Sequence, residues 1–114
     1  MGKPTIVCLC GSTRFGEAFA QANVDETLKG RIVLSICGTR PDAELFGHLT
    51  EIELKTVRAR LAELHRCKID LADEILVLNV GGYIGDDTRD EIAYARAHGK
   101  PIRWLEPATA EPFT

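Results

Sequence analysis

Residues 74–85 read EILVLNVGGYIG, an apolar run over 74–80 followed by a glycine-rich loop over 81–85. A nearly continuous apolar run of this length predicts a strand that is buried on both faces, as strands of parallel sheets are. The residues that follow the loop predict a helix that ends before Gly99 and Pro101. This strand–loop–helix order is typical of α/β proteins.

The rest of the chain repeats the same order on both sides of this stretch. The predicted strands cover residues 5–10, 32–37, 74–80 and 102–105, and the predicted helices cover 13–29, 50–71 and 87–98. Thr50 and Glu53 have the spacing of a capping box at the start of the middle helix. Residues 38–49 contain two glycines and a proline, and they predict a long loop.

These elements predict one domain over residues 1–106 and a loose tail over 107–114. Right-handed crossovers leave few possible topologies. We therefore expect an α/β fold, a flavodoxin/Rossmann-like three-layer sandwich with a parallel sheet of four or five strands in the order 2-1-3-4. The order reverses between strands 1 and 3, so a ligand crevice is expected at their carboxyl ends.

Composition excludes several classes of protein. The chain has 114 residues, with 14 Lys and Arg against 17 Asp and Glu, which gives a formal net charge of −3. A mildly acidic chain is a poor candidate for binding a nucleic-acid polymer. No apolar run is long enough for a membrane span or has the form of a signal peptide, so we expect a cytoplasmic protein. So small a domain with apolar helix faces favours a homo-oligomer, a dimer or larger.

The four cysteines are Cys8, Cys10, Cys37 and Cys67. Cys8 and Cys10 share one face of the first predicted strand, and Cys37 ends the second. The sequence shows no Cys-x-x-Cys motif and no Cys/His pairing, so we expect small buried thiols and no metal.

Two loops meet at the predicted crevice. The first, Gly11-Ser12-Thr13-Arg14, offers backbone N–H groups, hydroxyls and a guanidinium that suit a phosphate, although Ser12 or Thr13 could instead cap the following helix. The second loop runs from Asn79 to Asp87. Asn79 could bind a ligand or brace its loop, and Tyr83 could stack on a flat ring or cover the edge of the sheet.

Glu91 follows the second loop, and its carboxylate can face the crevice. The alternative is structural, because Thr88 and Glu91 also have capping-box spacing, and Asp86 and Asp87 compete as N-caps. His65 lies near the rim of an apolar helix stripe, where a histidine is more often a boundary residue than a catalyst.

Residues 72–79 (ADEILVLN), 87–95 (DTRDEIAYA) and 99–101 (GKP) resemble the nucleoside 2-deoxyribosyltransferase family, which includes the deoxynucleoside 5′-monophosphate N-glycosidases. Residues 10–14 (CGSTR) are similar to the phosphate-side loop of the nucleotide-cleaving branch. The resemblance implies a parallel sheet, a nucleophilic glutamate at Glu91 and homo-oligomers that close the pocket. His65 stands near the position of the family's base-side aspartate.

The expected activity is therefore cleavage or transfer at the N-glycosidic bond of a nucleoside or nucleoside 5′-monophosphate, without a cofactor. The expected catalytic residues are Glu91, His65 and Asp87, and the expected substrate-binding residues are Gly11, Ser12, Thr13, Arg14, Asn79, Gly82, Tyr83, Gly85, Asp86 and Thr88. The alternatives are a nucleotide-binding or signalling domain without catalysis, and a small oligomeric scaffold without a ligand.

Overall fold

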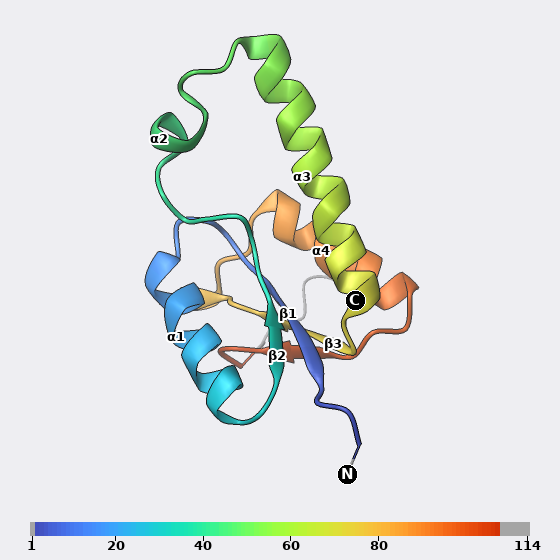
Figure 1. Cartoon of the computed structure of the whole chain (residues 1–114). Helices are drawn as coiled ribbons and strands as arrows, with labels where there is room; N and C mark the ends of the chain where they lie inside the picture. The colour runs from blue at the N-terminus through green and yellow to red at the C-terminus, as the bar shows by residue number, and fades with distance from the viewer. Residues whose placement is uncertain (1, 108–114) are drawn as a thin grey trace.

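The computed structural model describes residues 2–107, and within this range the chain folds around one parallel sheet (Figure 1). The strands are β1 (Ile6–Cys10), β2 (Ile32–Leu34), β3 (Glu74–Val77) and β4 (Ile102–Trp104). They form a four-stranded sheet in the order β2-β1-β3-β4, and every pairing is parallel. The predicted α/β class and strand order are confirmed.

Helices cover both faces of the sheet and make it the middle of three layers (Figure 1). Helix α1 (Gly16–Leu28) covers one face, and α3 (Glu51–Leu71) and α4 (Asp86–Ala97) cover the other. Val7 and Leu9 of β1 belong to the core under α1, whereas Cys8 and Cys10 belong to the core under α3 and α4. The alternation follows from the two-residue repeat of a strand.

The structure corrects several predicted boundaries. The expected loop over 38–49 contains a short helix, α2 (Asp42–Phe46). β2 ends at Leu34, so Cys37 lies beyond the strand and is exposed. β3 ends at Val77, and the chain then turns through a short 3-10 helix, η1 (Val80–Gly82), with left-handed backbones at Gly81 and Gly82. Residues 108–114 of the predicted tail lie outside the described part of the chain.

Helix α3 extends well beyond the sheet at its N-terminal end (Figure 1). Its first turn is held by the predicted capping box: the Glu53 N–H donates to Thr50 Oγ1 at 3.1 Å, and the Thr50 N–H donates to Glu53 Oε1 at 2.9 Å. Among residues 2–107, no helix is both long and apolar enough to cross a membrane.

Thr50→Ala tests how much the capping box stabilises this end of α3. The substitution leaves a backbone N–H without its side-chain acceptor, so we expect a cost of about 1 kcal/mol. The loss should appear as faster amide hydrogen exchange in residues 51–54. Glu63→Ala, at an exposed position further along the same helix, is the control and should leave that exchange unchanged.

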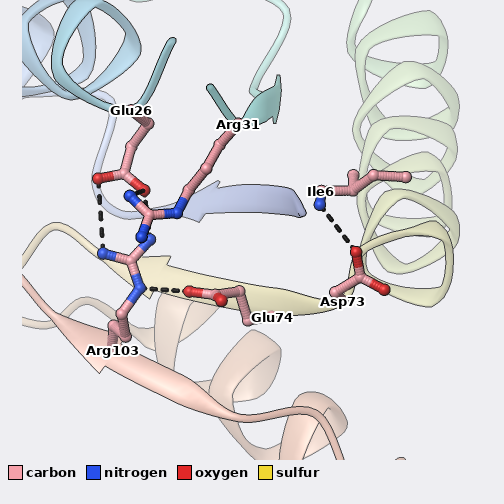
Figure 2. A network of polar contacts seen from close by, with 6 residues as sticks. All are labelled: Ile6, Glu26, Arg31, Asp73, Glu74 and Arg103. Carbon is pink, nitrogen blue, oxygen red and sulfur yellow. Dashed lines mark hydrogen bonds and ion pairs between the residues drawn. The ribbon is translucent and has the colours of Figure 1, made fainter. Parts of the chain in front are cut away.

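A network of charged side chains links the edge strand β4 to helix α1 and to Arg31, which directly precedes the other edge strand, β2 (Figure 2). The Glu26 carboxylate, whose side chain is only 4% exposed, forms ion pairs with Arg31 and Arg103. Arg103 of β4 also pairs with Glu74 of β3. Nearby, the Ile6 N–H donates to Asp73 Oδ2 at 2.8 Å. One buried carboxylate therefore connects α1 with the far strand.

Candidate functional site

A cavity of about 720 Å³ opens at the carboxyl ends of β1 and β3, on the side of the sheet that α3 and α4 cover. Its walls come from the loop after β1, from α2 and the facing side of α3, and from the start of α4. Ten predicted site residues line it: Gly11, Ser12, Thr13, His65, Tyr83, Gly85, Asp86, Asp87, Thr88 and Glu91. The cavity therefore lies where the strand order reverses, between β1 and β3, as the sequence predicted.

Glu91 lies in α4 with its carboxylate at this cavity. The capping-box interpretation is wrong, because α4 begins at Asp86 after Gly85, and the N-cap makes no side-chain hydrogen bond. Thr88 is a buried residue inside the first turn of the helix, so it cannot act as the cap. Asp86 and Asp87 are the first two residues of the helix and follow the N-cap Gly85, so they are not N-caps either.

The surroundings of Glu91 shift its protonation. Its Oε2 lies 3.6 Å from His65 Nε2, and its side chain is 20% exposed. Burial raises the pKa of Glu91 to about 7, with further upward contributions from the charges of Cys8 and Asp87, against the attraction of His65. A carboxyl group in this position changes its charge near neutral pH.

His65 is a buried residue on the inner side of α3, not the boundary residue that its position in the sequence favoured. Burial lowers its pKa, but the contact with Cys8 and the negative charge of Glu91 outweigh burial, so the pKa of His65 is raised above its ordinary value. Glu91 and His65 therefore form a pair that can share one proton.

Behind His65 lie two thiols of β1. His65 Nε2 is 3.7 Å from Cys8 Sγ and 3.4 Å from Cys10 Sγ, and both cysteines are fully buried. A hydrogen bond from Cys10 lowers the pKa of Cys8 to about 5, while the same contact and burial raise the pKa of Cys10 well above its ordinary value. Cys8 is therefore the more acidic of the two thiols.

This cluster corrects the cysteine analysis. The prediction of buried thiols is confirmed for Cys8 and Cys10 but is wrong for Cys37 and Cys67, which are exposed. The statement that no histidine accompanies the cysteines is also wrong. The sequence did offer one signal for this cluster: two thiols on one strand face and a histidine on the helix that covers this face. The signal was missed because the contacts join residues more than 50 positions apart.

The loop after β1 holds its residues without using them as caps. Helix α1 begins at Gly16 after Phe15, and this N-cap makes no side-chain hydrogen bond, so the capping interpretation of Ser12 and Thr13 is wrong. Ser12 Oγ accepts a hydrogen bond from the Arg14 N–H at 3.3 Å. Ser12 and Thr13 both line the cavity.

Arg14, in the loop after β1, contacts Tyr83, in the loop after β3. The guanidinium carbon of Arg14 lies 4.1 Å from the centre of the Tyr83 ring, an arrangement that gives a cation–π interaction. Tyr83 also meets the ring of Phe15 edge to face. Tyr83 lines the cavity, whereas Arg14 is not among the lining residues.

Asn79 and Gly82 serve the loop rather than the cavity. Asn79 Nδ2 donates to the backbone oxygen of Glu106 at 3.0 Å, and Asn79 Oδ1 accepts from the Glu106 N–H at 2.9 Å. Gly81 N–H donates to the Glu106 carboxylate. Of the two roles that the sequence left open for Asn79, the structure shows the brace. Neither Asn79 nor Gly82 lines the cavity.

Part of the cavity wall was not predicted from the sequence. Residues of α2 and the loop before it, among them Arg40 and Phe46, line the cavity, as do Arg58 and Lys68 of α3. Lys68 Nζ donates to the backbone oxygen of Ser35, and Arg58 pairs with Asp42 at 2.9 Å. These contacts hold residues 35–46 against α3, which a loop prediction could not show.

The chain matches no model of a known protein family, and no curated protein matches it.

Proposed function

We propose that this chain cleaves or transfers the N-glycosidic bond of a nucleoside or nucleoside 5′-monophosphate, with Glu91 as the nucleophile. The observation that supports the proposal best is a carboxylate at the cavity wall, 3.6 Å from a buried histidine, with a pKa of about 7. The resemblance of residues 72–79 and 87–95 to the nucleoside 2-deoxyribosyltransferases points to the same glutamate.

In the proposed reaction, the ionised Glu91 attacks the anomeric carbon through an oxocarbenium-like transition state. The carbon–nitrogen bond breaks, and the base leaves with the bonding electrons and takes a proton from His65 or Asp87. Water, or a second base, then displaces the sugar from Glu91. The charged form of His65 stabilises ionised Glu91, because opposite charges at this distance attract each other across a poorly solvated site.

We propose that the loop after β1 binds a 5′-phosphate. Gly11, Ser12 and Thr13 of this loop line the cavity, and so do Arg40 and Arg58, of which Arg58 is paired with Asp42. We infer that the substrate is a small molecule rather than a polymer and that the reaction needs no cofactor. We also propose that the protein works in the cytoplasm.

Association of several copies is part of the proposal. Large apolar side chains on α3 remain exposed, with Ile52 80% and Leu71 68% accessible. A long helix that extends past its own sheet with such residues is a surface that a second copy can cover.

Free base released from a panel of deoxyribonucleosides, ribonucleosides and their 5′-monophosphates tests the activity. We expect release from at least one member, with the reaction run in a chelator to exclude metal chemistry. Tight nucleotide binding, measured by calorimetry, without release from any member would contradict catalysis and favour the binding domain. Absence of a thermal shift with every member would favour the scaffold.

The pH dependence of kcat/KM reports the Glu91–His65 pair. Attack requires ionised Glu91, so the rate should fall on the acid side of its pKa of about 7. Donation from His65 requires the charged ring, so a second limb should fall at higher pH. His65→Gln should remove this basic limb and lower the rate by about 10²–10⁴-fold. A basic limb that persists in the variant would reject His65 as the donor.

A further inference from the structure

Three potential metal ligands meet at the inner end of the cavity, and a carboxylate lies next to them. Cys8 Sγ, Cys10 Sγ and a ring nitrogen of His65 lie within 4.8 Å of one another. The Glu91 carboxylate lies beside this group, with Oε2 3.6 Å from His65 Nε2. Cys8 and Cys10 come from β1, His65 from α3 and the neighbouring Glu91 from α4, so three separate elements of the fold contribute to this cluster.

The spacing of these atoms fits a tetrahedral ion. Zinc binds thiolate sulfur at about 2.3 Å and nitrogen or oxygen at about 2.0–2.2 Å, which puts neighbouring ligand atoms of a tetrahedron roughly 3.4–3.8 Å apart. His65 Nε2 lies 3.4 Å from Cys10 Sγ, 3.7 Å from Cys8 Sγ and 3.6 Å from Glu91 Oε2. The two sulfur separations from His65 Nε2 fall in the range that a shared zinc ion would impose, and the Glu91 oxygen lies close to it.

We propose that Cys8, Cys10, His65 and Glu91 form a binding site for one Zn²⁺ ion per chain. Two thiolates with one imidazole select a thiophilic cation over Mg²⁺ or Ca²⁺, which prefer oxygen. Binding removes the proton of Cys10 and leaves His65 neutral, so zinc affinity should increase with pH.

The ion has a route to this site. Cys8 and Cys10 are fully buried, but His65 and Glu91 line the cavity, and the Glu91 side chain is 20% exposed. An ion that enters the cavity meets Glu91 and His65 before it reaches the thiols. Zinc bound there occupies the carboxylate and the imidazole that the proposed glycosidic reaction needs, so metal and sugar should exclude each other.

Cobalt serves as the spectroscopic probe, because tetrahedral Co²⁺ bound by thiolates has a charge-transfer absorption that Zn²⁺ lacks. The full chain, reduced and stripped of metal by a chelator, is titrated with Co²⁺. We expect the charge-transfer band to saturate at one Co²⁺ per chain, to disappear when one equivalent of Zn²⁺ is added, and to persist in excess Mg²⁺. No band at saturating Co²⁺ in the wild-type chain would overturn the proposal without recourse to any variant.

Variants then locate the site. Cys8→Ser and Cys10→Ser should each weaken the charge-transfer band, and Cys67→Ser, which changes an exposed cysteine, is the matched control and should keep it. Glu91→Gln should retain the band and weaken Zn²⁺ binding at least 10-fold, since even residues that only support a metal ligand contribute about 10–100-fold. A full band in both Cys8→Ser and Cys10→Ser, or its loss in Cys67→Ser, would put the ion elsewhere.

This test is independent of the proposed glycosidic activity. Metal binding is measured by absorption, and base release is measured in chelator, so either result can fail alone. If both hold, one equivalent of Zn²⁺ should stop base release in the wild type, and chelator should restore it. Base release at full rate by the zinc-saturated chain would contradict ligation by Glu91.

Discussion

Glu91→Gln is expected to lower the rate of base release by on the order of 10³-fold or more, because removal of a nucleophile from a covalent mechanism costs at least about 4 kcal/mol of transition-state stabilisation. The amide has the size of the carboxylate but cannot form the glycosyl ester. Since burial raises the pKa of Glu91 to about 7, the uncharged amide should be tolerated by the fold.

The loss should fall on kcat more than on KM, because attack by Glu91 occurs in the transition state and not in the bound substrate. Glu63→Gln, the same chemical change at an exposed position of α3 outside the cavity, is the control and should keep full activity. Equal rates of release by Glu91→Gln and the wild type would reject the nucleophile assignment.

Glu26→Ala should reduce the free energy of unfolding by about 2–3 kcal/mol, the scale of lost hydrogen bonds to a charged group together with an ion pair broken on one side. Glu26 is 3% exposed and is the shared partner of Arg31 and Arg103 (Figure 2). The two guanidinium groups are about one-third exposed, so water screens the charge that remains and keeps the cost below that of a fully buried pair.

Thermal unfolding measures this effect. A change of about 2–3 kcal/mol corresponds to a fall in Tm of about 10–20 °C in a domain of this size. Asp42→Asn removes a carboxylate from the Arg58 pair, whose side chains are 58% and 63% exposed, and should cost less than about 1 kcal/mol. Equal losses in the two variants would contradict the account of Glu26 as the buried centre of the network.

The fold could be predicted because its signals are local and repeated. The apolar runs of β1 and β3 and the glycines after them reflect strands buried on both faces, and this pattern restricts the topology. The short helix α2 was missed because its five residues lie between Pro41 and Gly47 and contribute no buried side chain. Contacts with α3, such as the Arg58–Asp42 pair, hold this segment, and such contacts leave no periodic pattern in the sequence.

The site was predicted in its position but not in its chemistry. Strand order placed the cavity, and the spacing of Glu91 left both a functional and a capping role open. The start of α4 at Asp86 removed the capping role. His65 and the two thiols of β1 meet only through packing of α3 on the sheet, so their contact could not be predicted from spacing. Asn79 braces its loop and does not line the cavity, because the backbone of Glu106 hydrogen-bonds both ends of its amide.

The central claim is that the sugar becomes bonded to Glu91 during turnover. The most direct test uses a nucleotide that the wild-type chain cleaves. The reaction is quenched with acid, the protein is digested, and the masses of its peptides are measured by mass spectrometry. The account predicts that the peptide containing Glu91 gains the mass of the sugar phosphate, and that Glu91→Gln shows no such gain. Release of base with the added mass on another residue, or on none under rapid quenching, would contradict it.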